Sequence, residues 1–202
     1  MLNLRSTALL LLLSAVPAFS QPQTLFSGDI EQGVFAAPTG KFTQIAGDWG
    51  MMIGGRGEWL ADHQFGIGVG GYALVPAQIY SSFLIEGKAL TLRMTYLGLF
   101  LEYFFRPNDV LHVTVETMLG GGGLYYTITE GDQDKTPRPD NFGSEVYSVV
   151  EPGVNLELNL APYLRFVVGA SYRLAFNIDY QDLEEKDVNG LSANMGFRLG
   201  LF

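Results

Sequence analysis

The chain has 202 residues, of which 48% are hydrophobic and only 16% are charged, and it contains no cysteine. Twelve Lys and Arg against 21 Asp and Glu give a formal net charge of −9, which argues against binding of nucleic-acid phosphates. The lack of cysteine excludes disulfides, cysteine-based zinc sites and thiol nucleophiles. At roughly 150 residues per domain, the length predicts a single domain.

The first twenty residues follow the pattern of an export signal. Arg5 supplies positive charge, a short apolar run covers residues 8–16, and the small residues Ala18 and Ser20 stand at the cleavage-site positions. The run is shorter than the roughly 20 apolar residues that a membrane-anchoring helix needs. We therefore expect a signal peptide over residues 1–20, cleaved after Ser20, and one β-barrel domain over residues 21–202.

After the signal, apolar and polar residues alternate with a period of two, which is typical of β-strands with one apolar face. In residues 146–160 the even positions are mostly Val and Leu, whereas Glu151 and Glu157 occupy odd positions. The pattern recurs in 111–125, 164–174 and 191–201. The expected strands are 29–37, 49–60, 64–75, 90–105, 111–127, 146–160, 163–176 and 191–202.

The connections between these strands alternate between short and long. The short ones are 60–63, 106–109 and 160–163, and the long ones are 76–89, 128–144 and 177–190. Outer-membrane barrels have short periplasmic turns and longer external loops. The sequence therefore predicts an all-β fold, an eight-stranded antiparallel up-and-down transmembrane β-barrel in the outer membrane. A soluble exported barrel of the lipocalin type, with its apolar faces turned inward, is the alternative.

Charged residues fall on the strand faces opposite the apolar ones. With the apolar faces turned to lipid, these charges point into the lumen of an eight-stranded barrel, which is only wide enough for side chains to fill. We expect them to pair with one another and close the lumen rather than line an aqueous pore. This lumenal charge network comprises Arg56, Glu58, Glu102, Glu116, Glu151, Glu157, Arg165, Arg173 and Arg198.

The export signal, the eight strands and a chain that ends in Phe202 resemble the small outer-membrane barrels of the OmpA-transmembrane, OmpX and opacity-protein type. Aromatic residues near strand ends add to this resemblance, which covers the whole mature chain: Trp49/Trp59, Tyr103/Phe105 and Tyr125/Tyr126. It implies contact with outer-membrane lipid and lipopolysaccharide, and insertion by the barrel-assembly machinery. One feature departs from the family, because Arg198 and Gly200, rather than apolar residues, share the parity of Phe202.

Two further features concern the strands themselves. Pro152 lies inside the clearest strand but cannot donate a ladder hydrogen bond, so we expect a bulge around 151–153. Gly66, Gly68 and Gly70, like the glycine run at 120–123, indicate close packing or curvature rather than a phosphate-binding loop.

Candidate catalytic and metal-binding residues are few. His112, with Glu116 and Ser148, could in principle form a hydrolytic triad, but no G-x-S-x-G motif is present, so we expect His112 to bond to a lumenal carboxylate. The acidic residues within 179–187 lack the order of a calcium-binding EF-hand loop and predict a solvated acidic loop. We expect no enzyme and no cofactor.

The sequence thus favours a structural or interaction role for an integral outer-membrane barrel with a filled polar lumen. Its external loops would serve adhesion or envelope integrity, and the sequence does not identify their ligand. We expect a monomer. A channel for small solutes or hydrophobic compounds and a lipid-modifying outer-membrane enzyme are the two alternative functions.

Overall fold

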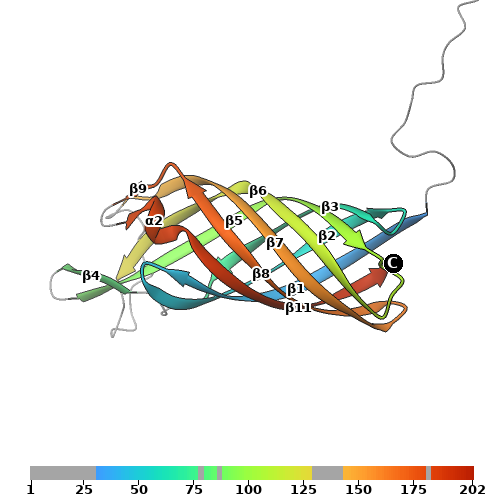
Figure 1. Ribbon diagram of the computed structural model, residues 1–202. Helices are drawn as coiled ribbons and strands as arrows, with labels where there is room; N and C mark the ends of the chain where they lie inside the picture. Colours follow the sequence, from blue (N-terminus) through green and yellow to red (C-terminus); the bar gives the residue numbers. More distant parts are fainter. Residues whose placement is uncertain (1–30, 77–79, 86–87, 129–142, 181–182) are drawn as a thin grey trace, which may run out of the picture. The chain divides into compact units, whose positions relative to one another are not determined.

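The computed structural model describes residues 31–76, 80–85, 88–128, 143–180 and 183–202. The unit Glu31–Phe202 is a closed barrel of tilted antiparallel strands (Figure 1). Its eight strands are β1 (Gln32–Ile45), β2 (Asp48–Ala61), β3 (Phe65–Leu74), β5 (Lys88–Phe105), β6 (Leu111–Ile128), β7 (Glu145–Ala161), β8 (Leu164–Phe176) and β11 (Gly190–Leu201).

The barrel has a simple up-and-down order, in which strands that follow one another pair. The first and last strands, β1 and β11, close the ring, with Val34 opposite Leu201. β3 pairs directly with β5, and the short strand β4 (Tyr80–Ile85) pairs with the part of β5 beyond β3. The predicted eight-stranded antiparallel barrel is therefore confirmed.

The two ends of the barrel differ. The start of β1 and the end of β11 lie at one end of the barrel, here called the terminal end. The turns β2–β3, β5–β6 and β7–β8 lie at the same end. The opposite loop end carries β4, β9 (Asp179–Tyr180), β10 (Leu183–Glu184) and α2 (Glu185–Val188) (Figure 1). Within the described residues, no helix has the length and hydrophobicity needed to cross a membrane.

The outer surface of the strands is apolar. Leu97, Val69 and Met195 expose 71%, 62% and 61% of their surface, and they belong to a belt of exposed large apolar side chains that includes residues of all eight strands. Water-soluble monomers rarely expose continuous apolar surface on this scale, whereas lipid hydrocarbon solvates it. The lipocalin-type alternative required these side chains to point inward, and the structure contradicts it.

Aromatic side chains gather near both ends of this belt. Phe42 stacks on Trp49 near the loop end, with ring centroids 4.9 Å apart. Phe65 and Tyr103 contact edge to face near the terminal end, also at 4.9 Å. Aromatic girdles at both membrane interfaces are characteristic of outer-membrane barrels.

The expected first strand, 29–37, was wrong in extent. β1 continues to Ile45, because Pro38 and Gly40, which weaken the alternation in the sequence, lie within a continuous register with β2. The connection to β2 consists only of Ala46 and Gly47, both with positive φ (52° and 83°). The expected alternation of short and long connections therefore fails at this loop-end turn.

The bulge expected around residues 151–153 is absent. Val150 faces Leu174 and Gly153 faces Ser171 in the same register, and Pro152 pairs with Thr117 of β6. Glu151 and Pro152 do not pair with β8. The missing N–H of Pro152 therefore interrupts the hydrogen-bond ladder between β7 and β8 but does not shift its register. The register shift of β7 occurs instead between Asn159 and Ala161, at the terminal end.

Candidate functional site

The structure places all nine residues of the lumenal charge network inside the barrel, each no more than 9% exposed. Sequence reasoning missed a tenth charge, Lys41, which is 3% exposed. Lys41 lies in the part of β1 that was assigned to a loop, and its shared parity with Phe35 in one continuous strand is the signal that could have revealed it. Among the described residues, the lumen thus holds five cations and five anions besides His112.

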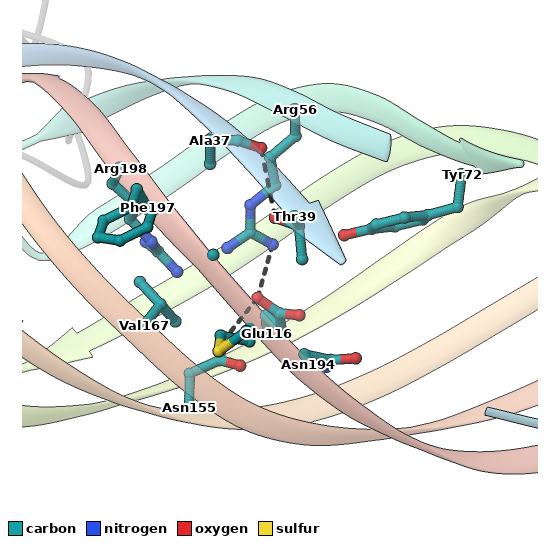
Figure 2. Close-up of a pocket in the computed structure, with 12 residues that line it drawn as sticks. Ala37, Thr39, Arg56, Tyr72, Glu116, Asn155, Val167, Asn194, Phe197 and Arg198 are labelled. Carbon is teal, nitrogen blue, oxygen red and sulfur yellow. Dashed lines mark hydrogen bonds and ion pairs between the residues drawn. The ribbon is translucent and has the colours of Figure 1, made fainter. Parts of the chain in front are cut away.

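Arg56 forms the centre of the network near the terminal end. Its Nε lies 2.7 Å from Glu58 Oε1, its Nη2 lies 3.0 Å from Glu102 Oε2, and its Nη1 lies 2.6 Å from Glu116 Oε2. Figure 2 shows that Glu116 also contacts Asn155, whose Nδ2 donates to the Glu116 carboxylate at 2.8 Å. One guanidinium therefore ties together strands β2, β5 and β6, and Asn155 adds β7.

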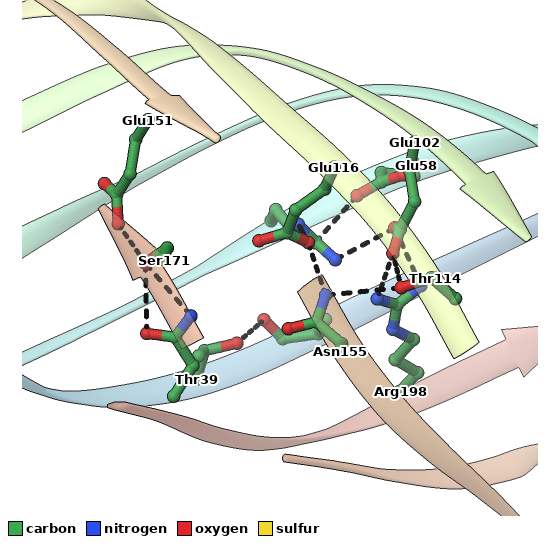
Figure 3. Close-up of polar contacts among 12 residues, drawn as sticks. Thr39, Glu58, Glu102, Thr114, Glu116, Glu151, Asn155, Ser171 and Arg198 are labelled. Atoms are coloured by element: carbon green, nitrogen blue, oxygen red, sulfur yellow. Dashed lines mark hydrogen bonds and ion pairs between the residues drawn. The ribbon is translucent and has the colours of Figure 1, made fainter. Parts of the chain in front are cut away.

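Arg198 of β11 extends the network around the barrel. It donates to both carboxylate oxygens of Glu102 and also lies 2.9 Å from Glu157 Oε1 (Figure 3 shows the contacts with Glu102). Glu157 in turn lies 3.3 Å from His112 Nε2 and 3.6 Å from Arg165 Nη1. His112 is thus buried beside a lumenal carboxylate.

A second cluster lies further toward the loop end. Lys41 Nζ is 2.5 Å from Glu151 Oε1, and Tyr96 donates to the other oxygen of Glu151 at 2.8 Å. Ser171 also donates to Glu151 (Figure 3), and Lys41 sits 3.7 Å above the ring centre of Tyr72. Every oxygen of this buried carboxylate has a partner, as a charge in low dielectric requires.

Glycines of β3 make room for these long side chains. A Cβ on Gly70 would collide with Arg56, and a Cβ on Gly68 would collide with Glu58 and with the backbone of Gly57. The glycines expected to permit close packing thus lie directly against the lumenal charges.

Apolar side chains close the barrel at both ends of the charge network. At the terminal end Phe35 stacks on Phe202 at 5.7 Å and packs beside Leu60 and Phe104. At the loop end, the described residues between β8 and β11 fold inward as a cap, which we define as residues 177–180 and 183–189. Its buried side chains join the core of the barrel: Ile178, Tyr180, Leu183 and Val188.

Arg173 anchors this cap to the barrel wall. It is fully buried and donates from Nε to Val188 O at 2.9 Å and from Nη2 to Gln44 O at 3.3 Å. The cap also accepts a backbone hydrogen bond from Ala46 to Asp187 O at 2.6 Å. Arg173 therefore differs from the other lumenal arginines, because its close oxygen partners are backbone carbonyls.

The acidic loop expected at 179–187 is more ordered than predicted. Asp179, Glu184 and Glu185 are exposed, but the apolar residues between them are buried in the cap. The hydrogen bond from Lys186 lowers the pKa of the Glu184 carboxyl, and the same bond raises the pKa of the Lys186 ammonium. Across the described part of the chain, no cluster of three or more His, Asp or Glu side chains is placed to hold a metal ion.

A cavity of about 20 Å³ lies beside Arg56, Tyr72 and Glu116, which is room for a single water molecule (Figure 2). The candidate triad is not assembled, because His112 is buried in the lumen whereas Ser148 is exposed on the outer face of β7.

Fold and site together define a small closed membrane β-barrel with a filled lumen. No protein-family model matches the chain, and no curated protein matches it. Solved structures do match it, and the three described next share 10–14% of their residues with it.

Three outer-membrane proteins illustrate this similarity. A major outer membrane protein from Thermus thermophilus superposes with a TM-score of 0.56 at 14% identity, covering 84% of this chain and 99% of that one. Neisserial surface protein A gives 0.53 at 10% identity, covering 85% and 99%. The N-terminal β-barrel domain of Pseudomonas aeruginosa OprF gives 0.51 at 14% identity, covering 86% and 100%. The chain has the fold of the small outer-membrane barrels.

Proposed function

We propose that the protein is an integral outer-membrane barrel, exported by a cleaved signal peptide, that acts as a sealed anchor for the surface at its loop end. Its role is structural or adhesive, in contact with the envelope or with an external ligand. The observation that carries this proposal is the filled lumen, in which paired charges occupy the middle and apolar clusters occupy both ends.

In this proposal the terminal end faces the periplasm and the loop end faces outward. The turns β2–β3, β5–β6 and β7–β8 lie together with the end of the last strand, as in barrels inserted from the periplasmic side. The exposed carboxylates of the cap, Asp179, Glu184 and Glu185, then face the lipopolysaccharide layer, where divalent cations bridge them to anionic groups. We expect the barrel to insert as a monomer with the help of the barrel-assembly machinery.

The alternative functions have less support. A channel requires a continuous path, but the cavity beside Arg56 and Glu116, in the middle of the charge network, has room for only one water. A lipid-modifying enzyme requires a reactive group next to a base, and His112 and Ser148 lie on opposite faces of the barrel wall.

Single-channel recording in planar bilayers tests the sealed lumen. The purified full-length mature barrel should insert without discrete conductance steps, while a porin added to the same bilayer serves as the control for insertion. Reproducible steps from the unmodified protein would contradict the proposal and favour transport.

Binding of lipopolysaccharide vesicles tests the proposed surface role. The triple variant Asp179→Asn, Glu184→Gln, Glu185→Gln should lose Mg²⁺-dependent vesicle binding, because its carboxylates are neutralised while the buried cap is unchanged. The matched control is Asp62→Asn, which removes one exposed carboxylate at the terminal end. Equal binding by the triple variant and the unmodified protein would overturn this role for the cap.

A further inference from the structure

A pocket of about 390 Å³ opens at the terminal end, next to the turns β5–β6 and β7–β8. Its volume lies in the range of small-molecule sites, roughly 300–1,000 Å³. We call it the terminal pocket. Its lining combines apolar and polar residues, which include Pro107, Asn159, Leu160, Pro162, Arg165 and Phe202. The pocket is bordered by Arg165 of the charge network and by Phe202 of the apolar cluster at the terminal end.

Arg165 supplies a charged hydrogen-bond donor whose ion pair with Glu157 is long. The residue is only 5% exposed, and among the residues that the structure describes its buried Nη1 has no partner within hydrogen-bond distance. Glu157 lies 3.6 Å away, beyond hydrogen-bond distance, and is held more closely by Arg198 at 2.9 Å. The guanidinium is positioned by the ring of Phe202, 3.8 Å below it.

Asn159 supplies the complementary acceptor. Its Nδ2 donates to the carbonyl oxygens of Pro107 and Asp109 at 3.0 and 2.8 Å, which fixes the orientation of the amide. Its Oδ1 is buried and has no hydrogen-bond partner within the described part of the chain. The register shift of β7 between Asn159 and Ala161 lies at this point. A buried polar atom without a partner is unfavourable, and a bound group that satisfies it recovers that cost.

From these observations we infer that the terminal pocket binds a peptide-like carboxylate, such as the free carboxyl end of a peptide. The ligand carboxylate accepts from Arg165, and the adjacent amide N–H donates to Asn159 Oδ1. Leu160, Pro107 and Pro162 provide an apolar rim for the side chain next to that carboxylate. The pocket faces the periplasm if the proposed orientation is correct, but binding itself does not depend on that orientation.

The test uses the full mature barrel in detergent micelles, titrated with N-acetylalanine and followed by ¹⁵N-¹H NMR. We expect saturable shifts of the backbone amides of Asn108 and Ala161, with a dissociation constant on the order of 1 mM. N-acetylalanine methyl ester, which has the amide but no carboxylate, should bind at least about tenfold more weakly, since a charge-assisted hydrogen bond is lost.

Three variants separate a specific site from general attraction. Arg165→Gln should weaken binding about tenfold, and Ala161→Trp should abolish it by filling the pocket while leaving Arg165 in place. Arg106→Gln removes a highly exposed arginine on the neighbouring turn and should leave binding unchanged. If Arg165→Gln fails to fold, Ala161→Trp still decides the question.

Several results would overturn the inference. They are equal affinity for the methyl ester, an equal loss of binding in Arg106→Gln, unchanged binding in Ala161→Trp, or no saturation at concentrations on the order of 10 mM, in which case the pocket holds only water. Because this titration does not measure conductance or vesicle binding, its failure leaves the proposed function standing, and failure of the proposed function leaves the titration interpretable.

Discussion

Arg198 binds Glu102 with both ends of its guanidinium, at 2.8 Å from Nη1 to Oε2 and 2.7 Å from Nη2 to Oε1. Both side chains are almost completely buried, and Glu102 also partners Arg56. Glu102→Gln leaves two buried cations without their shared anion, so the free energy of unfolding should fall by about 3–5 kcal/mol. Urea unfolding of the barrel in lipid vesicles measures it.

The control for this prediction is an exposed ion pair of the same type. Arg106 Nε lies 3.3 Å from Asp109 Oδ2, and the Arg106 side chain is 85% exposed. Arg106→Gln should change the free energy of unfolding by about 0–1 kcal/mol. A cost for Glu102→Gln no larger than this would contradict a stabilising lumenal network.

Lys41 and Glu151 should behave as a coupled pair. Lys41→Met leaves the buried carboxylate without its 2.5 Å partner, and Glu151→Gln leaves the ammonium without its anion. Each should lower the free energy of unfolding by about 3–5 kcal/mol, and the double variant should cost about 1–3 kcal/mol less than their sum. Strictly additive losses in this double-mutant cycle would show that the two charges do not interact.

The cap should loosen when its arginine is removed. Arg173→Met loses the hydrogen bonds to Val188 O and Gln44 O but keeps a long apolar side chain, so cap opening should become easier by about 1.5–3 kcal/mol. Hydrogen–deuterium exchange should accelerate at residues 183–190 while the centre of β7 stays protected. Lys186→Ala, which removes only a surface pair with Glu184, is the control and should exchange at the unmodified rate.

The free-energy cost of placing a charge on the outer belt should depend on its depth in the membrane. Ile53 lies midway between Trp49 and Trp59 along β2 and is 55% exposed, so Ile53→Arg places a charge in the hydrocarbon layer and should cost about 2–4 kcal/mol. Val110 is 68% exposed in the β5–β6 turn, and Val110→Arg should cost about 0–1 kcal/mol. Equal costs in vesicle-based unfolding would argue against a lipid-facing belt.

The sequence predicted strand bounds and side-chain directions best where the alternation of apolar and polar residues was strong. The bounds of β7, β8 and β11 differ from the expected strands by one residue at each end at most, and their charged positions point inward as predicted. β1 was predicted poorly, because Pro38 and Gly40 removed the apolar signal from its second half. Lys41 was missed for the same reason.

The ion-pair partners of the lumenal side chains were harder to predict than the strand faces on which these side chains lie. Alternation assigns Glu102 and Arg198 to the lumen, but they are 96 residues apart in the chain, and only closure of the barrel brings them together. The cap was missed because its acidic composition concealed the apolar set of Tyr180, Leu183 and Val188. The residue pattern along the chain does not show that a loop folds back over the lumen.

We expect this chain to form a closed barrel in the outer membrane. The most direct measurement is to express the full chain with its signal, separate the inner membrane, outer membrane and periplasm, and run each fraction on gels with and without boiling. We predict recovery in the outer membrane with a mobility that changes on boiling, because a closed barrel resists unfolding in detergent at room temperature. Recovery as a soluble periplasmic protein with a single mobility would show that the chain is not an outer-membrane barrel.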